Sequence, residues 1–174
     1  MSGLSGLSGV CGASGVIAFV GVGANLGEAG RTVVEVLAAL GRLPGCMLRR
    51  ASAVYRSAPV DAVGPDFYNA VAELTTTLSP LELLQALQSI EQAYGRERPY
   101  HNAPRTLDLD LLLHGDALLN TPALTLPHPR LQLRAFVLQP LLDLAPDRAA
   151  PGLGPLAAWL PGVAGQALQR LPTP

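Results

Sequence analysis

The chain is 174 residues long, 49% of its residues are hydrophobic, and its formal net charge is -1. This length and apolar content suffice for one buried core, so we expect a single domain. All twelve residues counted as Lys or Arg are arginines, which excludes a phosphate-binding loop of the GxxxxGK(S/T) type. The arginines are scattered, and no basic run indicates binding to a nucleic acid or an anionic membrane.

The first 15 residues are rich in Gly, Ser and Leu and predict a flexible leader, so the predicted domain comprises residues 16–174. Two cysteines, Cys11 and Cys46, are too few for a disulfide framework or a zinc site. No stretch stays apolar for the ~20 residues that a membrane-spanning helix needs. We therefore expect a cytoplasmic protein without membrane contact.

Strand and helix signals alternate in the first half of the domain. A continuous apolar run predicts a buried strand at 16–23. The next segment predicts a helix at 31–43, closed near Gly41. The apolar residues that lie at helical intervals in this segment are Val33, Val34, Leu37 and Leu40. Segments 47–55 and 68–76 are rich in β-branched or alternating residues and predict two strands joined by a long loop.

A second helix has the clearest local signal. Ser79 can be its N-cap, Pro80 fits the first helical position, and Glu82 completes a capping box. The helix should run to about Tyr94 and end at Gly95. Its buried stripe is expected to comprise Leu83, Leu84, Leu87 and Ile90, with Gln88 and Glu91 largely on another face.

The segment 106–113, TLDLDLLL, alternates polar and apolar residues over its first half and predicts a strand with one polar face. The element order is then β-α-β-β-α-β, which predicts the α+β fold class with a ferredoxin-like antiparallel sheet and two helices on one face. C-terminal additions should include a short strand at 124–126, a helix at 134–144 and a short helix around Trp159.

Asp108 and Asp110 are the central candidates for chemistry. Residues two apart on a strand point to the same face, so the two carboxylates should lie side by side. Adjacent carboxylates repel each other unless a cation lies between them, and such oxygen ligands suit Mg²⁺ bound together with substrate phosphates. A bare Asp-x-Asp pattern leaves a solvated strand face as the alternative.

Other polar residues near this strand fit phosphate and heterocycle binding. Arg96, Arg98 and Arg105 flank it and can match phosphate oxygens, although surface ion pairs are the alternative. His128 lies between two prolines and should be held in place, assisting binding rather than acting as a general base. Asn69 follows an aromatic pair, a combination that can hold a flat heterocycle.

Residues 17–147 contain a series of sequence blocks that together resemble those of a known protein family. The blocks are GANLG, YRSAPV, FYNAVAEL, LQSIEQAYGRER, APRTLDLDLLLHG and LTLPHPRLQLRAFVLQPLLDLAPD. With these blocks the chain resembles the 6-hydroxymethyl-7,8-dihydropterin pyrophosphokinase family. The resemblance implies Mg-dependent transfer of pyrophosphate from ATP to the pterin, giving AMP and the pterin diphosphate in folate biosynthesis.

The resemblance also implies roles for individual residues. Asp108 and Asp110 are similar to the pair that holds two Mg²⁺ ions, and with Arg96 and Arg105 they form the implied catalytic set. The implied ATP-binding residues are Gln88, Glu91, Arg96, Arg98, Arg105, His128 and Arg134. The implied pterin-binding residues are Ser57, Pro59, Val60, Phe67, Asn69 and Phe136.

The partners implied are the small molecules ATP and the pterin, with no nucleic acid and no membrane, and we expect a monomer. We also expect residues 95–104 to form a mobile lid over ATP. Two alternatives remain from the residues themselves. One is a metal-dependent phosphohydrolase that uses the same aspartates with water as the nucleophile. The other is a non-catalytic ferredoxin-like binding module, because that fold hosts many functions.

Overall fold

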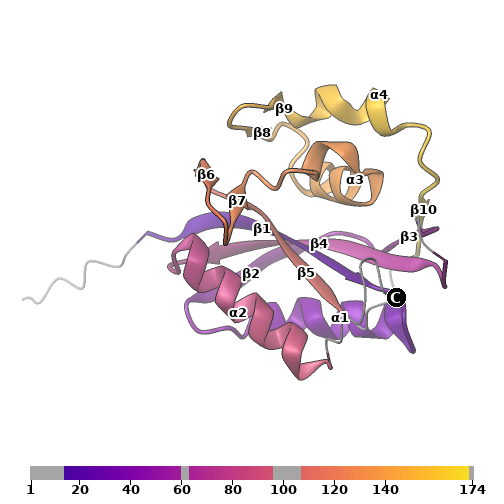
Figure 1. Cartoon of the computed structure of the whole chain (residues 1–174), viewed down its shortest axis with the longest axis horizontal. Coiled ribbons are helices and arrows are strands. Elements are labelled where there is room, and N and C mark those ends of the chain that lie inside the picture. The colour runs from indigo at the N-terminus through magenta and orange to yellow at the C-terminus, as the bar shows by residue number, and fades with distance from the viewer. Residues whose placement is uncertain (1–13, 60–62, 96–106, 173–174) are drawn as a thin grey trace, which may run out of the picture.

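The computed structural model of the chain describes residues 14–59, 63–95 and 107–172. It combines helices with a six-stranded antiparallel sheet (Figure 1). The strands of this sheet are β1 (Val16–Ala24), β2 (Cys46–Ala51), β3 (Tyr55–Ser57), β4 (Phe67–Thr76), β5 (Asp108–His114) and β10 (Gln169–Arg170). The sheet order is β10-β3-β4-β1-β5, and β2 pairs with β4 beside β3. The predicted leader comprises residues 1–15, of which residues 1–13 lie outside the described residues.

Helices cover both faces of the sheet. Helices α1 (Ala29–Leu40) and α2 (Pro80–Ala93) lie on one face, and α3 (Ala135–Leu144) and α4 (Leu160–Val163) lie on the other (Figure 1). Two buried apolar clusters fill the two interfaces. The cluster under α3 also includes residues of the 3₁₀ helices η1 (Leu131–Leu133) and η2 (Leu156–Trp159).

Strand β1 lies inside the sheet, between β4 and β5, and contributes apolar residues to both faces. Val20 and Val22 belong to the cluster under α1 and α2, whereas Phe19 belongs to the cluster under α3. Its neighbours β4 and β5 both pair with it antiparallel. The strands predicted at 16–23 and 68–76 are therefore confirmed, with one additional residue each.

Helix α1 begins earlier than predicted and buries a different stripe. It starts at Ala29 rather than at residue 31, and Val34 is 45% exposed while Val36 is buried. Gly41 does end the helix, but with φ -70°, so a left-handed turn is not the reason for glycine. A Cβ at Gly41 would lie 2.9 Å from the Leu48 Cβ, so the close approach of β2 requires a residue without a side chain.

Helix α2 confirms the predicted capping box and corrects the predicted face. The Ser79 hydroxyl accepts a hydrogen bond from the Glu82 N–H at 3.2 Å, and the Glu82 carboxylate accepts one from the Ser79 N–H at 2.8 Å. Gly95 has φ +74°, the left-handed conformation typical of a helix C-terminus. Glu91 is only 2% exposed, so it lies on the buried face with Leu87, one turn away, and not on another face.

The segment predicted as one strand at 47–55 is divided into β2 and β3. At Ser52 the backbone N–H donates to the Val71 carbonyl at 2.9 Å, but the Val71 N–H donates to the Ser52 hydroxyl instead of a carbonyl. A register shift at Arg49 precedes this break. The shift lets both Arg49 and Arg50 pair with the buried Glu73 carboxylate on β4.

The C-terminal additions agree with the predictions at 124–126, at 134–144 and around Trp159. Three further pairs were not predicted, namely β6 (Leu119–Asn120) with β7 (Thr125–Leu126), β8 (Ala149–Ala150) with β9 (Gly154–Pro155), and β10 with β3. Among the helices in the described part of the chain, none combines the length and apolarity needed to span a bilayer.

Candidate active site

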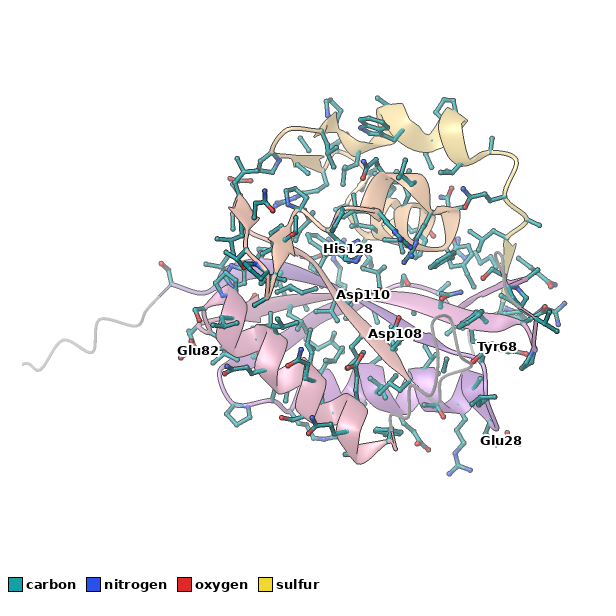
Figure 2. All side chains as sticks on the ribbon, viewed as in Figure 1. Glu28, Tyr68, Glu82, Asp108, Asp110 and His128 are labelled. Carbon is teal, nitrogen blue, oxygen red and sulfur yellow. The ribbon has the colours of Figure 1, made fainter. Side chains whose placement is uncertain are left out.

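The carboxylates of β5 lie on the face of the sheet that α3 covers. Leu109 and Leu111 belong to the cluster under α1 and α2, so Asp108 and Asp110, which alternate with them, point to the opposite face. The prediction that the two aspartates share one face of a strand is therefore confirmed. Figure 2 shows both along β5, with His128 above Asp110.

Glycine separates these carboxylates from the residues of β4. Gly23 pairs with Asp108 on one side and with Asn69 on the other, so the three residues form one row across the sheet. Asp108 and Asn69 are two strands apart, about 10 Å. A Cβ at Gly23 would lie 3.1 Å from the Asn69 Oδ1, so Asn69 extends over the glycine. Gly21 occupies the corresponding position beside Asp110 in the next row.

The predicted pterin residues of β3 and β4 lie next to one another. Asn69 is 5% exposed, and its Nδ2 donates to the Ser57 hydroxyl at 3.0 Å, which fixes the orientation of the amide. Phe67 pairs with Ser57 and is half-buried, as is Pro59 at the end of the described segment. Val60 lies outside the described residues.

His128 is held beside β5 by backbone contacts. Its N–H donates to the Leu112 carbonyl at 3.0 Å, and its Nδ1 accepts from the Arg130 N–H at 3.1 Å. Burial lowers the pKa of His128 to about 4, with a further lowering by the positive charge of Arg134. Asp108 opposes this shift in pKa, and Arg130 adds to it. The imidazole is therefore neutral at pH 7, with its proton on Nε2.

The Nε2 of His128 lies 3.9 Å from the Asp110 Oδ1. Because the ring is neutral, this contact is not an ion pair at neutral pH, and it places a polar N–H near the carboxylate. The arrangement suits a residue that orients its neighbours.

Arg134 and Phe136 lie at the beginning of α3. Arg134 is the N-cap residue, and its guanidinium carbon is 5.5 Å from the centroid of the Phe136 ring, within the range of a cation–π contact. Helix α3 packs on β4 and β3, and Phe136 packs against the apolar cluster beneath the helix. The start of α3 therefore belongs to the same side of the sheet as Asn69 and Asp108.

Glu91 approaches β5 from the other layer. Its Oε1 accepts a hydrogen bond from the Leu109 N–H at 2.8 Å, between the two aspartates. Because β5 is an edge strand, the Leu109 N–H has no partner among the described strands on that side, and the Glu91 carboxylate serves as its acceptor. Gln88 is exposed three residues earlier on α2. A ligand that touched both these residues and the aspartates would have to extend around the edge of β5.

The described residues fit a metal bound jointly with a ligand better than a metal held by protein alone. Within residues 14–59, 63–95 and 107–172, no group of three or more His, Cys, Asp or Glu could hold a metal ion. Two carboxylates on one strand face suit Mg²⁺, which prefers oxygen ligands and commonly completes its shell with water and phosphate. Arg96, Arg98 and Arg105, together with most of the predicted lid, lie outside the described residues.

Sequence reasoning missed two features of this region. Gly21 and Gly23 leave β1 without side chains between β4 and β5, and two glycines within a predicted strand were a usable signal of a close approach. Gln166 contacts the start of α3 from a distant segment, and nothing in its local sequence indicated that contact.

Comparison with known proteins identifies the family. Residues 19–146 match the family model described as 7,8-dihydro-6-hydroxymethylpterin-pyrophosphokinase (HPPK). The chain belongs to this family. The matched HPPK region contains every residue predicted for the site, from Ser57 to Phe136.

HPPK relatives resemble the chain over most of its length. A 2-amino-4-hydroxy-6-hydroxymethyldihydropteridine pyrophosphokinase of Pseudomonas aeruginosa is 46% identical over 155 residues, covering 88% of this chain and 96% of that protein. Relatives with the same name from Synechocystis sp. and Haemophilus influenzae are 44% and 39% identical. They cover 79% and 78% of this chain, and 70% and 86% of their own lengths.

Solved structures share the fold. The crystal structure of an HPPK-DHPS in complex with substrates has a TM-score of 0.68 at 13% identity, covering 84% of this chain and 43% of that chain. An HPPK-DHPS of Plasmodium falciparum has a TM-score of 0.65 at 14% identity, covering 83% of this chain and 45% of that chain. This chain thus spans less than half of each of those two chains, and at these identities the likeness concerns the fold alone.

Proposed function

We propose that this HPPK family member transfers the pyrophosphoryl group of Mg·ATP to the hydroxyl of 6-hydroxymethyl-7,8-dihydropterin, in folate biosynthesis. The family match and the names of its relatives support this activity. The structural observation that carries the proposal is the row formed by Asn69, Gly23 and Asp108. In this row Asn69, which can hydrogen-bond a heterocycle, and Asp108, which can bind a metal ion, lie on the same face of the sheet, and the residue between them is Gly23.

The pterin would bind over β3 and β4. The buried Asn69 amide is oriented by Ser57 and can offer its second N–H and its carbonyl to a heterocycle. Phe67 and Phe136 supply aromatic surfaces on the same side of the sheet, and Pro59 and Val60 complete the proposed set. A flat ring held there would have its hydroxymethyl group directed toward Gly23 and the aspartates.

ATP would bind along β5. Asp108 and Asp110 would hold two Mg²⁺ ions, which neutralise phosphate charge when bound. His128 places its Nε2 3.9 Å from the Asp110 Oδ1, and Arg134 adds a positive charge near His128. Gln88 and Glu91 would contact the nucleotide around the edge of β5. By family resemblance, Arg96, Arg98 and Arg105 would meet the triphosphate.

In the proposed reaction the pterin hydroxyl oxygen loses its proton to solvent and bonds to the β-phosphorus, while the bond from that phosphorus to the oxygen bridging the α-phosphate breaks. AMP is then the leaving group, and the pterin diphosphate is the second product. The catalytic set would be Arg96, Arg105, Asp108 and Asp110. Positioning and charge neutralisation would supply most of the rate enhancement, as is usual in phosphoryl transfer.

We further infer a ferredoxin-like fold in one domain spanning residues 16–174, after a leader at 1–15. If β2 and β3 are counted as one interrupted strand, the strands of the β-α-β-β-α-β unit lie in the order second, third, first, fourth, which supports this inference. We propose that the protein acts as a cytoplasmic monomer on small molecules.

One experiment tests the proposed function. The protein is incubated with Mg·ATP and 6-hydroxymethyl-7,8-dihydropterin, and the nucleotide product is identified by chromatography. We expect AMP to form in step with consumption of the pterin. ADP as the main product, phosphate release without pterin, or no turnover would instead support another kinase, a phosphohydrolase or a binding module, respectively.

A further inference from the structure

Gln166 holds the backbone on both sides of Arg134. Its Oε1 accepts a hydrogen bond from the Ala135 N–H at 2.9 Å, and its Nε2 donates to the Leu133 carbonyl at 2.8 Å. Gln166 is 31 residues from Ala135 along the chain, in the segment that follows α4. One amide side chain therefore satisfies a donor and an acceptor that flank a single residue.

This contact replaces the usual cap of α3. Arg134 is the N-cap residue but provides no side-chain hydrogen bond to the first turn, where backbone N–H groups lack partners within the helix. Gln166 supplies one such partner from outside the helix. The rotation of the first turn then determines where the Arg134 guanidinium and the Phe136 ring lie, and these two groups are 5.5 Å apart.

The same segment continues to the opposite side of the site. Gln169 and Arg170 form β10, which pairs with β3 at Arg56 and Tyr55. The Gln169 Oε1 also accepts a hydrogen bond from the Arg56 guanidinium at 2.8 Å. Strand β3 ends at Ser57, the partner of Asn69. Within a few residues, the C-terminal segment contacts both the start of α3 and the strand that orients Asn69.

We propose that Gln166 is a positioning residue for substrate binding, acting through Arg134 and Phe136. The inference rests on the proposed function, in which Arg134 meets ATP and Phe136 meets the pterin. Gln166 lies beyond residues 19–146, the part of the chain that matches the HPPK family model. Its two side-chain hydrogen bonds go to backbone atoms of Leu133 and Ala135, so its effect passes through the backbone of residues 133–135.

The test compares variants of Gln166 in the full chain. Gln166→Leu removes both hydrogen bonds at similar size, and we expect the KM for ATP and for the pterin to rise about 5- to 10-fold each, with a smaller change in kcat. Gln166→Glu can still accept from the Ala135 N–H but cannot donate to the Leu133 carbonyl, and we expect an intermediate effect. It also provides a second variant if Gln166→Leu folds poorly.

Two control variants separate positioning from general stability. Val163→Ala removes two buried methyl groups from α4, in the same layer, and changes no atom of the two Gln166 hydrogen bonds. Gln85→Ala removes an exposed glutamine from α2. We expect neither to change either KM by more than about 2-fold, even where Val163→Ala lowers the Tm as much as Gln166→Leu does. A KM that follows the Tm in all variants, or one that is unchanged in Gln166→Leu, would overturn the proposal.

A readout without turnover distinguishes failure of this inference from failure of the proposed function. Hydrogen exchange of the amides of residues 135–137 should be faster in Gln166→Leu than in the wild type and in Val163→Ala. The Kd of an unreactive ATP analogue with Mg²⁺ should rise in parallel with the KM. If the wild type forms no AMP, the proposed function fails while these measurements still decide the inference, and equal exchange and equal Kd would refute it.

Discussion

Single residues at the carboxylate pair offer the most direct test of the site. Replacing Asp108 or Asp110 by Asn preserves side-chain size but removes one negative charge from the face where Mg·ATP is proposed to bind. We expect AMP formation to fall by about 100-fold or more in each variant, because charge neutralisation carries much of the catalysis of phosphoryl transfer. The Tm should stay within ~2 °C of the wild type, since no apolar volume is lost.

The matched control is Asp116→Asn, in the turn after β5. The Asp116 side chain is 89% exposed and pairs with Arg148 at 3.7 Å, away from the proposed site. The rate of AMP formation by the Asp116→Asn variant should equal that of the wild type. Near-normal AMP formation in either β5 variant would show that the aspartates are only a solvated strand face.

The burial of Glu91 illustrates what the sequence can and cannot predict for a single residue. Leu83, Leu87 and Glu91 are spaced four residues apart and share one face of α2, so the spacing alone predicts burial. The charge of Glu91 argues against burial, because a buried carboxylate is costly without a hydrogen-bond partner. The partner is the Leu109 N–H at the sheet edge, which only the tertiary structure supplies. By contrast, the common face of Asp108 and Asp110 followed from strand geometry and was predictable.

At the level of elements, the glycines of β1 allow a matched pair of substitutions. A Cβ at Gly23 would lie 3.1 Å from the Asn69 Oδ1, so Gly23→Ala requires Asn69 to shift. A Cβ at Gly21 would make an ordinary contact at 3.6 Å with Leu112, so Gly21→Ala requires no shift. We expect Gly23→Ala to raise the KM for the pterin about 5-fold or more and Gly21→Ala to change it by less than about 2-fold. Steady-state kinetics with both substrates would measure this, and equal effects of the two variants would contradict the proposed placement of the pterin over Asn69.

A hydrogen bond between β3 and α3 should make stability depend on pH in alkaline solution. The Tyr55 hydroxyl donates to the Asp143 carboxylate, and burial, followed by this bond and the negative charge of Asp143, raises the pKa of Tyr55 to about 12. The positive charge of Arg170 acts in the opposite direction on this pKa. In the unfolded chain the tyrosine loses its proton near its ordinary pKa of 10. The unfolded state therefore binds fewer protons between about pH 10 and pH 12, and stability falls there as pH rises.

Tyr55→Phe removes this ionisation. We expect the Tm of the wild type to fall more steeply between pH 10 and pH 12 than the Tm of Tyr55→Phe, as measured by circular dichroism during heating. Asp143→Asn should also reduce the slope, because it removes the charge that holds the proton on Tyr55. Identical slopes in all three proteins would refute this account.

The division of the predicted strand at 47–55 illustrates a limit at this scale. Its residues have a continuous strand-like pattern, and the interruption arises because the Ser52 hydroxyl takes the place of a carbonyl opposite Val71. The register shift at Arg49 similarly depends on Glu73 of the partner strand. Both are properties of a pair of strands, so neither segment predicts them alone. The capping box of α2 lies within one segment and was predictable.

In the whole molecule, the proposed site lies between the sheet and the layer that contains α3, except for Gln88 and Glu91 on α2. The sequence predicted the strands and helices that form this arrangement, because each has its own periodicity. It did not predict β6, β8, β9 or β10, because strands of two residues carry no periodic signal. The contacts of β10 and Gln166 join segments far apart in the chain, and long-range contacts of this kind depend on the completed fold.

The two helical layers should unfold together if residues 16–174 form one domain. Trp159 is the only tryptophan of the chain and lies in η2, where its Nε1 donates to the Leu153 carbonyl at 3.0 Å, so its fluorescence reports on the α3 side. Leu87 is fully buried on α2, on the opposite side of the sheet. Leu87→Ala should lower the free energy of unfolding by about 2–5 kcal/mol through the cavity it creates.

Because the sheet is shared by both layers, we expect this loss to shift the midpoint of Trp159 fluorescence by the same amount as the midpoint of far-UV circular dichroism in a urea titration. Leu81→Ala, at a position 49% exposed on the same helix, should shift both midpoints only slightly. If Leu87→Ala moved the circular dichroism midpoint and left the fluorescence midpoint in place, the α3 layer would be stable by itself. The chain would then consist of two cooperative units, and the site between them would assemble only when both are folded.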